Sequence, residues 1–309
     1  MRDAFFEVLT AVGAEDERVW ALTGDLGIGL FTGFEEAAPG RYLNVGIAEQ
    51  NLVGIAAGLA YAGKVPFAYS IAPFITSRAH DQVRVDVALA RANVKLVGVG
   101  GGLAYGTLGP THHAIEDVAL MRALPNLTVL APADPAEARG AARAALEVDG
   151  PVYLRLGKNG EPALLPPEPF VVGRARLARD GADLTICATG PVLGEAIAAA
   201  GTLAEQGVDA AVLHFPTLKP FDVDAVAEAL ERSPLVVTVE EHSVIGGLGS
   251  AVAEAAAESG RPVRLRRLGL QDSFAHAVGK REHLLAVYGL DAPAIVETAH
   301  ALCDARSLA

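Results

Sequence analysis

Cysteine, methionine and tryptophan are scarce in this sequence of 309 residues, which holds two Cys, two Met and one Trp. Cys187 and Cys303 lie far apart and form neither a C-x-x-C pair nor a metal-ligand spacing. A disulfide framework is therefore not expected. Both side chains are expected to be small apolar groups in a protein of the reducing cytosol.

Positive charge and long apolar runs are also in short supply. The chain carries 25 Lys and Arg against 37 Asp and Glu, a net charge of −12, and has no Lys/Arg-rich run, so nucleic acid is not expected as a partner. The most apolar helix-like run, residues 52–62, is far shorter than the ~20 residues of a membrane span. The first twenty residues carry acids within their apolar stretch, unlike a secretory signal. The sequence predicts a cytoplasmic protein with no membrane segment.

The length favours two domains, since one domain commonly holds ~100–200 residues. In the first half, nearly all-apolar short runs alternate with helical patterns, which is typical of a parallel sheet covered by helices on both faces. Strands are expected at 19–23, 42–45, 66–71, 94–99, 127–131 and 152–156. Helices are expected at 2–12, 48–62, 76–92, 115–123 and 135–147.

A stretch dense in proline and glycine follows from Lys158 and is typical of a linker. A second series comes after it, with strands expected at 184–188, 210–215, 235–239 and 263–268 and helices at 196–206, 223–232, 249–259 and 292–305. The sequence therefore predicts an α/β protein of two tandem domains with mainly parallel sheets. Their expected bounds are 1–160 and 183–309, with a linker at 161–182.

Three glycine-rich loops follow predicted strands and begin at Gly27, Gly98 and Gly247. Dinucleotide binding needs G-x-G-x-x-G between strand and helix, so that the backbone can approach a pyrophosphate. Each loop lacks the third glycine, and the sequence holds no G-x-x-x-x-G-K-[ST] motif. Tight turns are the simpler interpretation, and nicotinamide chemistry is not expected.

Polar side chains gather just past the ends of predicted strands, where a parallel sheet presents its loops to ligands. Glu49 opens a helix in the segment GIAEQN, where it would also complement the helix dipole. Tyr69, Phe74 and Arg78 lie in YSIAPFITSR, which taken alone is most often packing plus a surface charge.

Two adjacent histidines, His112 and His113, lie in the loop GPTHHAIED, where an imidazole finds little apolar cover. One interpretation pairs them with Glu116 or Asp117 on the following helix. The other is a proton-transfer site, because histidine titrates near neutral pH. Metal binding is less favoured, since no third ligand is suitably spaced.

Together these segments resemble the transketolase family of thiamine diphosphate enzymes over nearly the whole chain. The segment GIAEQ is similar to the family's cofactor-activating glutamate motif, and GPTHH followed by IEDVALMRALPNLTV is similar to its active-site stretch. Residues 185–300 are similar to the family's carboxy-terminal domain. The resemblance makes residues 1–160 a pyrimidine-binding domain and residues 183–309 a transketolase-like carboxy-terminal domain.

The resemblance also implies roles at the cofactor. The aminopyrimidine of thiamine diphosphate removes the thiazolium C2 proton, and Glu49 would promote the imino tautomer that acts as base. Phe74 would stack on the pyrimidine. Tyr69 and Arg78 would be further cofactor contacts, with substrate as the alternative for Arg78. Asp25 matches an acidic position at the family's site interface.

Substrate contacts are implied in the same way. His112 matches the family's histidine near the reacting carbonyl, where it would bind substrate and transfer a proton or stabilise an oxyanion. His113 is a second catalytic candidate whose role stays open. Arg155 resembles the arginine that holds the substrate's phosphate, a task to which a forked guanidinium is suited.

A complete member of the family has a further domain ahead of these two, which binds the diphosphate through Mg²⁺ and carries Gly-Asp-Gly and a downstream asparagine. This chain has Gly24-Asp25-Leu26 and no suitable asparagine. The resemblance therefore implies a split enzyme, in which a separate amino-terminal subunit supplies the diphosphate and Mg²⁺ site. An α2β2 assembly is expected, and the chain alone is expected to be inactive.

Leu108 stands where the family has an acidic residue that contacts the donor sugar's hydroxyl. Leucine cannot accept that hydrogen bond, and an unpaired hydroxyl costs about 1–3 kcal/mol. The resemblance therefore implies transfer of a two-carbon ketol unit from a ketose, phosphorylated or not, to an aldose. Because of Leu108, the standard pentose phosphate pair is not assigned as the substrates, and the donor and acceptor sugars stay open.

Two other functions stay open. The β component of a 2-oxoacid dehydrogenase, or a synthase acting on pyruvate, shares the two-domain layout, although GPTHH favours the transketolases. A non-catalytic regulatory subunit of the same fold is the other, and the joint presence of Glu49, Phe74 and His112 argues against it.

Overall fold

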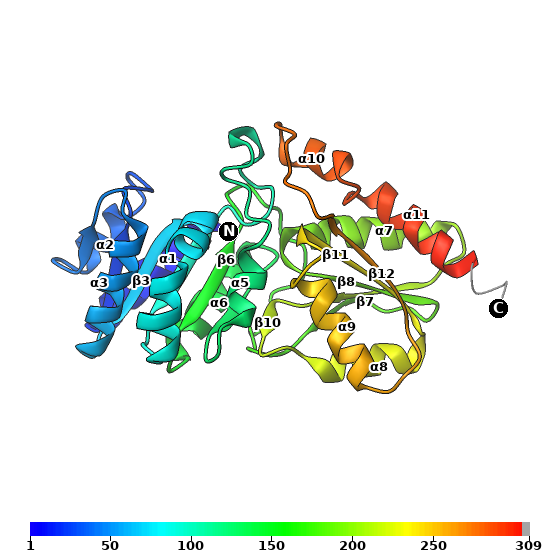
Figure 1. Cartoon of the computed structure of the whole chain (residues 1–309), viewed down its shortest axis with the longest axis horizontal. Helices are drawn as coiled ribbons and strands as arrows, with labels where there is room; N and C mark the ends of the chain where they lie inside the picture. The colour runs from blue at the N-terminus through cyan, green and yellow to red at the C-terminus, as the bar shows by residue number, and fades with distance from the viewer. Residues whose placement is uncertain (305–309) are drawn as a thin grey trace.

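The computed structural model describes residues 1–304, which form two α/β lobes side by side (Figure 1). The sheet of the first lobe consists of β1 (Val19–Thr23), β2 (Tyr42–Asn44), β3 (Val65–Ile71), β4 (Lys95–Val99), β5 (Thr128–Leu130), β6 (Val152–Leu156) and β10 (Thr217–Lys219). In space they run β10-β5-β6-β4-β3-β1-β2. β10 is antiparallel to β5, and the other pairs are parallel.

Helices cover both faces of this sheet. The helical segments are α1 (Arg2–Glu15), α2 (Thr32–Ala37), α3 (Glu49–Tyr61), the π-helix η1 (Phe74–Arg78), α4 (His80–Gln82), the π-helix η2 (Val83–Leu89), the 3₁₀ turn η3 (Gly106–Leu108), α5 (Asp117–Ala123) and α6 (Pro135–Glu147). α1, α2 and α6 pack in one apolar cluster, and α3, η1, η2 and α5 pack in another. α6 begins where Asp134 accepts a 2.9 Å hydrogen bond from the backbone of Glu137 and Pro135 takes the first helical position.

The second lobe has a five-stranded sheet made of β7 (Arg176–Arg179), β8 (Leu184–Ala188), β9 (Ala210–His214), β11 (Leu235–Ser243) and β12 (Arg264–Leu270), in the order β12-β11-β8-β9-β7. β7 is antiparallel to β9, and the other pairs are parallel. The remaining segments are η4 (Gly190–Val192), α7 (Leu193–Glu205), α8 (Val223–Arg232), α9 (Leu248–Glu258), α10 (Arg281–Val287) and α11 (Ala292–Asp304). Figure 1 shows α7 and α11 on one side of this sheet and α8 and α9 on the other.

The prediction of two tandem α/β units with mainly parallel sheets is confirmed. The expected strands and most of the expected helices lie within a few residues of the observed ones. Residue 305, the predicted end of the last helix, lies outside the described residues. No helix within residues 1–304 is long and apolar enough to cross a membrane.

The structure contains short helices that the sequence pattern does not predict, among them α2 and α10, and it departs from the expectation in three further places. Residues 176–179 of the predicted linker form β7, whose mixed sequence RLAR carries no clear strand pattern. β10 lies in the second half of the chain, but it pairs with β5 at the edge of the first sheet. The helix expected at 76–92 is broken into η1, α4 and η2. Such π-helical turns often occur at functional sites.

Candidate functional site

The parallel strands β1, β2, β3, β4 and β6 end at the same edge of the first sheet. The loops that leave this edge carry most of the residues singled out from the sequence. The ends of parallel strands are where open α/β sheets bind ligands, so this edge of the sheet is the candidate site.

Glu49 is the first residue of α3 and is only 2% exposed. Its Oε2 accepts a 2.8 Å hydrogen bond from Nη1 of Arg78, and its Oε1 accepts a longer one, 3.4 Å, from the hydroxyl of Ser70. A buried carboxylate is stabilised only when it is paired or hydrogen-bonded. Glu49 is therefore a fixed buried anion with a cation and a hydroxyl beside it.

Phe74 and Arg78, at the two ends of η1, connect Glu49 to His112. The Cζ atom of Arg78 lies 4.3 Å from the centroid of the Phe74 ring, within cation–π distance. The His112 ring meets Phe74 edge to face, with centroids 5.1 Å apart, and its Nδ1 lies 2.9 Å from the hydroxyl of Thr111. The predicted residues Glu49, Phe74, Arg78 and His112 thus form one continuous cluster.

The charge state of His112 follows from its surroundings. Partial burial lowers the pKa of His112 below its usual value, and electrostatic interactions with the neighbouring His113 and Arg78 lower it further. The imidazole of His112 is therefore neutral at pH 7 and can accept a proton.

His113 contacts the second lobe. It is 2% exposed, and its Nδ1 lies 3.1 Å from the backbone oxygen of Ala275. A carbonyl oxygen only accepts, so Nδ1 carries the hydrogen and Nε2 is left as an acceptor. Nε2 has no hydrogen-bond partner within residues 1–304. His113 also lines a cavity of about 350 Å³ together with Phe74, Arg78 and Phe274.

Asp25 lies at the rim of the same edge. It is exposed and has a left-handed backbone, with φ of 59°. Its backbone N–H donates to Oδ1 of Asn44 and its carboxylate accepts from Nδ2 of Asn44, at 3.0 and 2.9 Å. This reciprocal pair fixes the β1 loop against the end of β2, close to the start of α3.

Tyr69 does not belong to the cluster, which corrects its expected cofactor contact. It is 1% exposed and packs against Phe5, Phe6 and Phe31 under α1 and α2. Burial raises the pKa of Tyr69 well above its usual value. Neighbouring strand residues face opposite sides of a sheet, so Ser70, which the sequence analysis missed, faces Glu49 instead.

Arg155 is also placed differently from its expected contact with a substrate phosphate. It is 4% exposed, and its guanidinium donates to both oxygens of Asp117, at 2.8 and 3.2 Å. It donates further to the backbone oxygens of Ala114 and Glu241, each at 2.9 Å. These internal acceptors occupy the guanidinium, so Arg155 joins the site loop to the second lobe.

Glycines make that junction possible. A Cβ on Gly101 would lie 2.8 Å from Cγ of Arg155, and one on Gly102 would lie 2.5 Å from Cβ of Glu241. Gly102 also has a φ of +65°, which glycine adopts at little cost. The glycine-rich loop after β4 is therefore a close-packed contact between the lobes, in line with the interpretation of these loops as tight turns.

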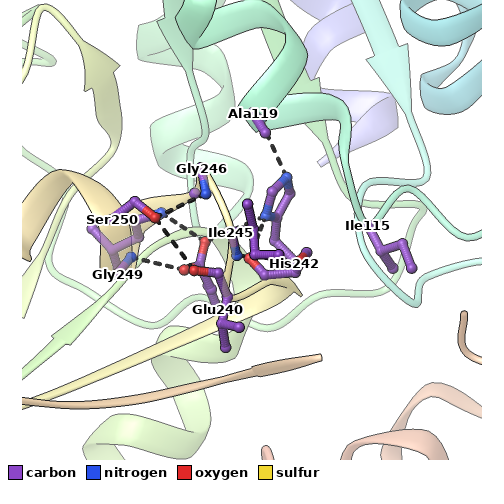
Figure 2. A network of polar contacts seen from close by, with 12 residues as sticks. Ile115, Ala119, Glu240, His242, Ile245, Gly246, Gly249 and Ser250 are labelled. Carbon is purple, nitrogen blue, oxygen red and sulfur yellow. Dashed lines mark hydrogen bonds and ion pairs between the residues drawn. The ribbon is translucent and has the colours of Figure 1, made fainter. Parts of the chain in front are cut away.

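A second polar network closes the glycine loop before α9 (Figure 2). The Glu240 carboxylate accepts hydrogen bonds from the backbone N–H groups of Leu248 and Gly249, at 2.7 and 2.8 Å. His242 accepts a 3.2 Å hydrogen bond at Nε2 from the backbone of Ala119 in α5. The free N–H groups of this helix end are thus bound by the protein's own carboxylate, which occupies the position an anionic ligand would take.

Metal ligands do not gather in the part of the chain that the structure describes. No group of three or more His, Cys, Asp or Glu side chains within residues 1–304 is arranged to hold a metal ion.

Comparison with known proteins adds to this geometry. The family model for the transketolase pyrimidine-binding domain matches residues 1–161, and the one for the transketolase carboxy-terminal domain matches residues 173–295. The 6-deoxy-6-sulfo-D-fructose transketolase subunit SqwH of Clostridium sp. (strain MSTE9) is 43% identical, with 99% of this chain and 95% of the relative covered.

Two further relatives are similar over most of their length. A subunit of the apulose-4-phosphate transketolase of Actinobacillus succinogenes is 41% identical, with 87% of each chain covered. A solved structure described as a split gene transketolase, inactive beta4 tetramer, is 40% identical, with a TM-score of 0.90 and 98% of each chain covered.

Proposed function

The chain belongs to the transketolase family, and from that premise we propose that it is the carboxy-terminal subunit of a split transketolase-type enzyme. The reaction is transfer of a two-carbon ketol unit from a ketose to an aldose acceptor. The observation that carries the proposal is the cluster of a buried Glu49, the Phe74 ring and a neutral His112 at the edge of a parallel sheet.

The domain bounds are part of this proposal. We propose a pyrimidine-binding domain at residues 1–160, then a connecting segment that begins at residue 161, and a carboxy-terminal domain that continues to residue 309. The family-model matches at 1–161 and 173–295 support this division. Because residues 176–179 form β7 of the second sheet, the connecting segment is proposed to end before β7 and not at residue 182, where the sequence predicts its end.

The family depends on thiamine diphosphate, and the cluster fits the pyrimidine end of that molecule. A planar group with N–H donors, the Arg78 guanidinium, already lies over Phe74 and bonds to Glu49, so this space accepts a flat donor. When bound, thiamine diphosphate supplies the nucleophilic carbon. Glu49 would then hold a ring nitrogen by a hydrogen bond, and Phe74 would stack on the ring.

His112 and His113 act on the substrate side in this proposal. His112, neutral at pH 7, accepts or returns a proton at the sugar's reacting oxygen. His113 presents Nε2 as an acceptor, since its Nδ1 hydrogen is held by Ala275. A sugar hydroxyl is the donor that suits such an acceptor.

The diphosphate and Mg²⁺ are proposed to be held by a separate amino-terminal subunit. Arrangement as α2β2 and inactivity of the isolated chain follow from this. The proposal is supported by relatives of similar length that are named as transketolase subunits and by the relative described as an inactive beta4 tetramer.

For the sugars, we propose donors outside the standard pentose phosphate pair. Leu108 is half-exposed and cannot accept a hydrogen bond from a donor hydroxyl. The relatives named for 6-deoxy-6-sulfo-D-fructose and apulose 4-phosphate suggest ketoses with an anionic terminal group as the first candidates to test.

The test is reconstitution. The chain and its amino-terminal partner, mixed with thiamine diphosphate and Mg²⁺, are expected to transfer the two-carbon unit from such a ketose to glyceraldehyde 3-phosphate, with neither subunit active alone. Decarboxylation of pyruvate with no ketol transfer would assign the chain to the 2-oxoacid or synthase group instead. Full activity of the partner without this chain would make it a regulatory subunit.

A further inference from the structure

One side chain, Arg78, contacts both groups that the proposed function assigns to the cofactor's pyrimidine. Its Nη1 donates to Oε2 of Glu49 at 2.8 Å, and its guanidinium carbon lies 4.3 Å from the centre of the Phe74 ring. A guanidinium is planar, donates hydrogen bonds in its plane and stacks on aromatic faces. An aminopyrimidine shares the first and last of these properties and has ring nitrogens that a carboxyl group can bind.

The two partners of this ion pair differ in burial. Glu49 is 2% exposed and fixed at the start of α3, whereas the Arg78 side chain is 48% exposed. A buried carboxylate left alone is costly, while a half-exposed guanidinium can turn into water with little desolvation to reverse. Breaking the ion pair therefore costs more free energy at the buried Glu49 carboxylate than at the half-exposed Arg78 guanidinium.

A second carboxylate lines the cavity of about 350 Å³ that Arg78 borders. Glu116 lines it together with Arg78, and Oε1 of Glu116 accepts a 3.3 Å hydrogen bond from Ser77, the residue before Arg78. A guanidinium that leaves Glu49 thus has a second acidic side chain, Glu116, among the residues that line a cavity with it.

We propose that Arg78 is an exchangeable counter-ion of Glu49. It occupies the pyrimidine position in the subunit without cofactor and gives that position up when the cofactor binds. The inference rests on the proposed function, because it takes Glu49 and Phe74 as the pyrimidine contacts. Arg78 is then a positioning residue. It pairs with the Glu49 carboxylate and covers the Phe74 ring before the enzyme assembles, and it competes with the cofactor for these two groups.

The direction of the effect on cofactor affinity tests the proposal. Arg78→Met removes the internal competitor, so the apparent Kd of the assembled enzyme for thiamine diphosphate, measured by calorimetry in Mg²⁺, is expected to fall roughly three- to fivefold. Arg84→Met is the matched control, since Arg84 is an exposed arginine on the neighbouring η2 segment, and its Kd is expected to be unchanged. An unchanged or raised Kd for Arg78→Met overturns the exchange.

Unfolding of the isolated chain gives an independent readout. Arg78→Met leaves Glu49 buried without a cation, so the thermal midpoint is expected to fall by a few degrees, and Glu49→Gln in the same chain is expected to restore most of the loss. Equal and additive losses in the two single variants would show that the pair is not coupled, and the proposal would fail.

Binding measurements on the two variants separate a failure of the proposed function from a failure of the Arg78 exchange. If Glu49→Gln leaves the affinity for thiamine diphosphate unchanged, the proposed function itself is wrong. If Glu49→Gln weakens binding and Arg78→Met weakens it as well, the function stands and Arg78 is an ordinary ligand contact.

Discussion

The guanidinium of Arg155 and the carboxylate of Asp117 form a completely buried ion pair, 4% and 1% exposed, between β6 of the first sheet and the start of α5. Tyr153 donates a 2.7 Å hydrogen bond to the same carboxylate. Burial raises the pKa of Asp117, but the charge and hydrogen bonds of Arg155 outweigh it and hold the pKa below its usual value. Because Arg155 also reaches Glu241, this pair sets how the lobes meet beside the histidine loop.

Arg155→Met is expected to destabilise the chain by about 3–5 kcal/mol, because it leaves Asp117 charged and buried without its cation. Urea unfolding of the isolated chain measures the loss. Arg84→Met, at an exposed position, is expected to stay within about 0.5 kcal/mol of the parent. Adding Asp117→Asn to Arg155→Met is expected to recover part of the lost stability. A loss below about 1 kcal/mol for Arg155→Met, the range of an exposed ion pair, would contradict a strongly stabilising buried pair between Arg155 and Asp117.

Glu49→Gln is expected to lower kcat of the reconstituted enzyme by about a hundredfold or more, because an amide cannot promote the pyrimidine tautomer as a carboxyl group does. The thermal midpoint of the chain is expected to change little, since glutamine keeps the side chain's size. Glu36→Gln, at an exposed position on α2, is the control. Retention of full activity by Glu49→Gln would remove the main support for the proposed function.

Acid stability is expected to depend on Glu137. Burial alone would raise the pKa of Glu137, but His214, the backbone N–H of Ala133 and Arg176 together lower it to about 2. A carboxyl whose pKa is lower in the folded state stabilises the fold above its unfolded pKa near 4.5. This contribution, on the order of 3 kcal/mol, is lost as the pH falls from about 4.5 to 2.

The measurement is the free energy of unfolding as a function of pH. Glu137→Gln is expected to be less stable than the parent at pH 7 and to show a smaller fall in stability between pH 4.5 and 2. Parallel curves for the two proteins would contradict the assignment.

The pKa of His112 is expected to rise when Arg78 is replaced by methionine, since a nearby positive charge that disfavours the imidazolium is removed. A histidine NMR titration of the isolated chain measures the change, with His112→Gln identifying the resonance. Arg84→Met is expected to leave the His112 pKa unchanged. A fall in the pKa of His112 in Arg78→Met would be inconsistent with the contacts described.

Much of the fold could be predicted from the sequence because its signals are local. Apolar runs such as Leu184–Ala188 and helix patterns such as Pro135–Glu147 were placed at their observed bounds. The segment Thr32–Ala37 is too short to give a helix pattern. Arg176–Arg179 has a mixed sequence of two arginines and two apolar residues without a strand pattern, and it forms a strand by pairing with β9.

The site was predicted in part. Glu49, Phe74, Arg78 and His112 were identified because motifs at strand ends point to the same edge, and the structure brings them together. Tyr69 and Ser70 are neighbours in the sequence, so no motif shows which of them faces Glu49. That choice depends on which helices cover each face of β3.

By itself, the sequence determined the class of fold, the family and the polar residues at the ends of the strands, because periodicity and motifs are written in neighbouring positions. Only the tertiary structure decided that Arg155 is buried in an ion pair with Asp117. It also decided that Arg78 bonds to Glu49 and stacks on the Phe74 ring. It also placed the His113 hydrogen against Ala275 in the other lobe. The physical reason is that burial and pairing of a charge depend on groups far apart in the chain, such as Arg155 and Glu241, which meet only once both lobes are packed.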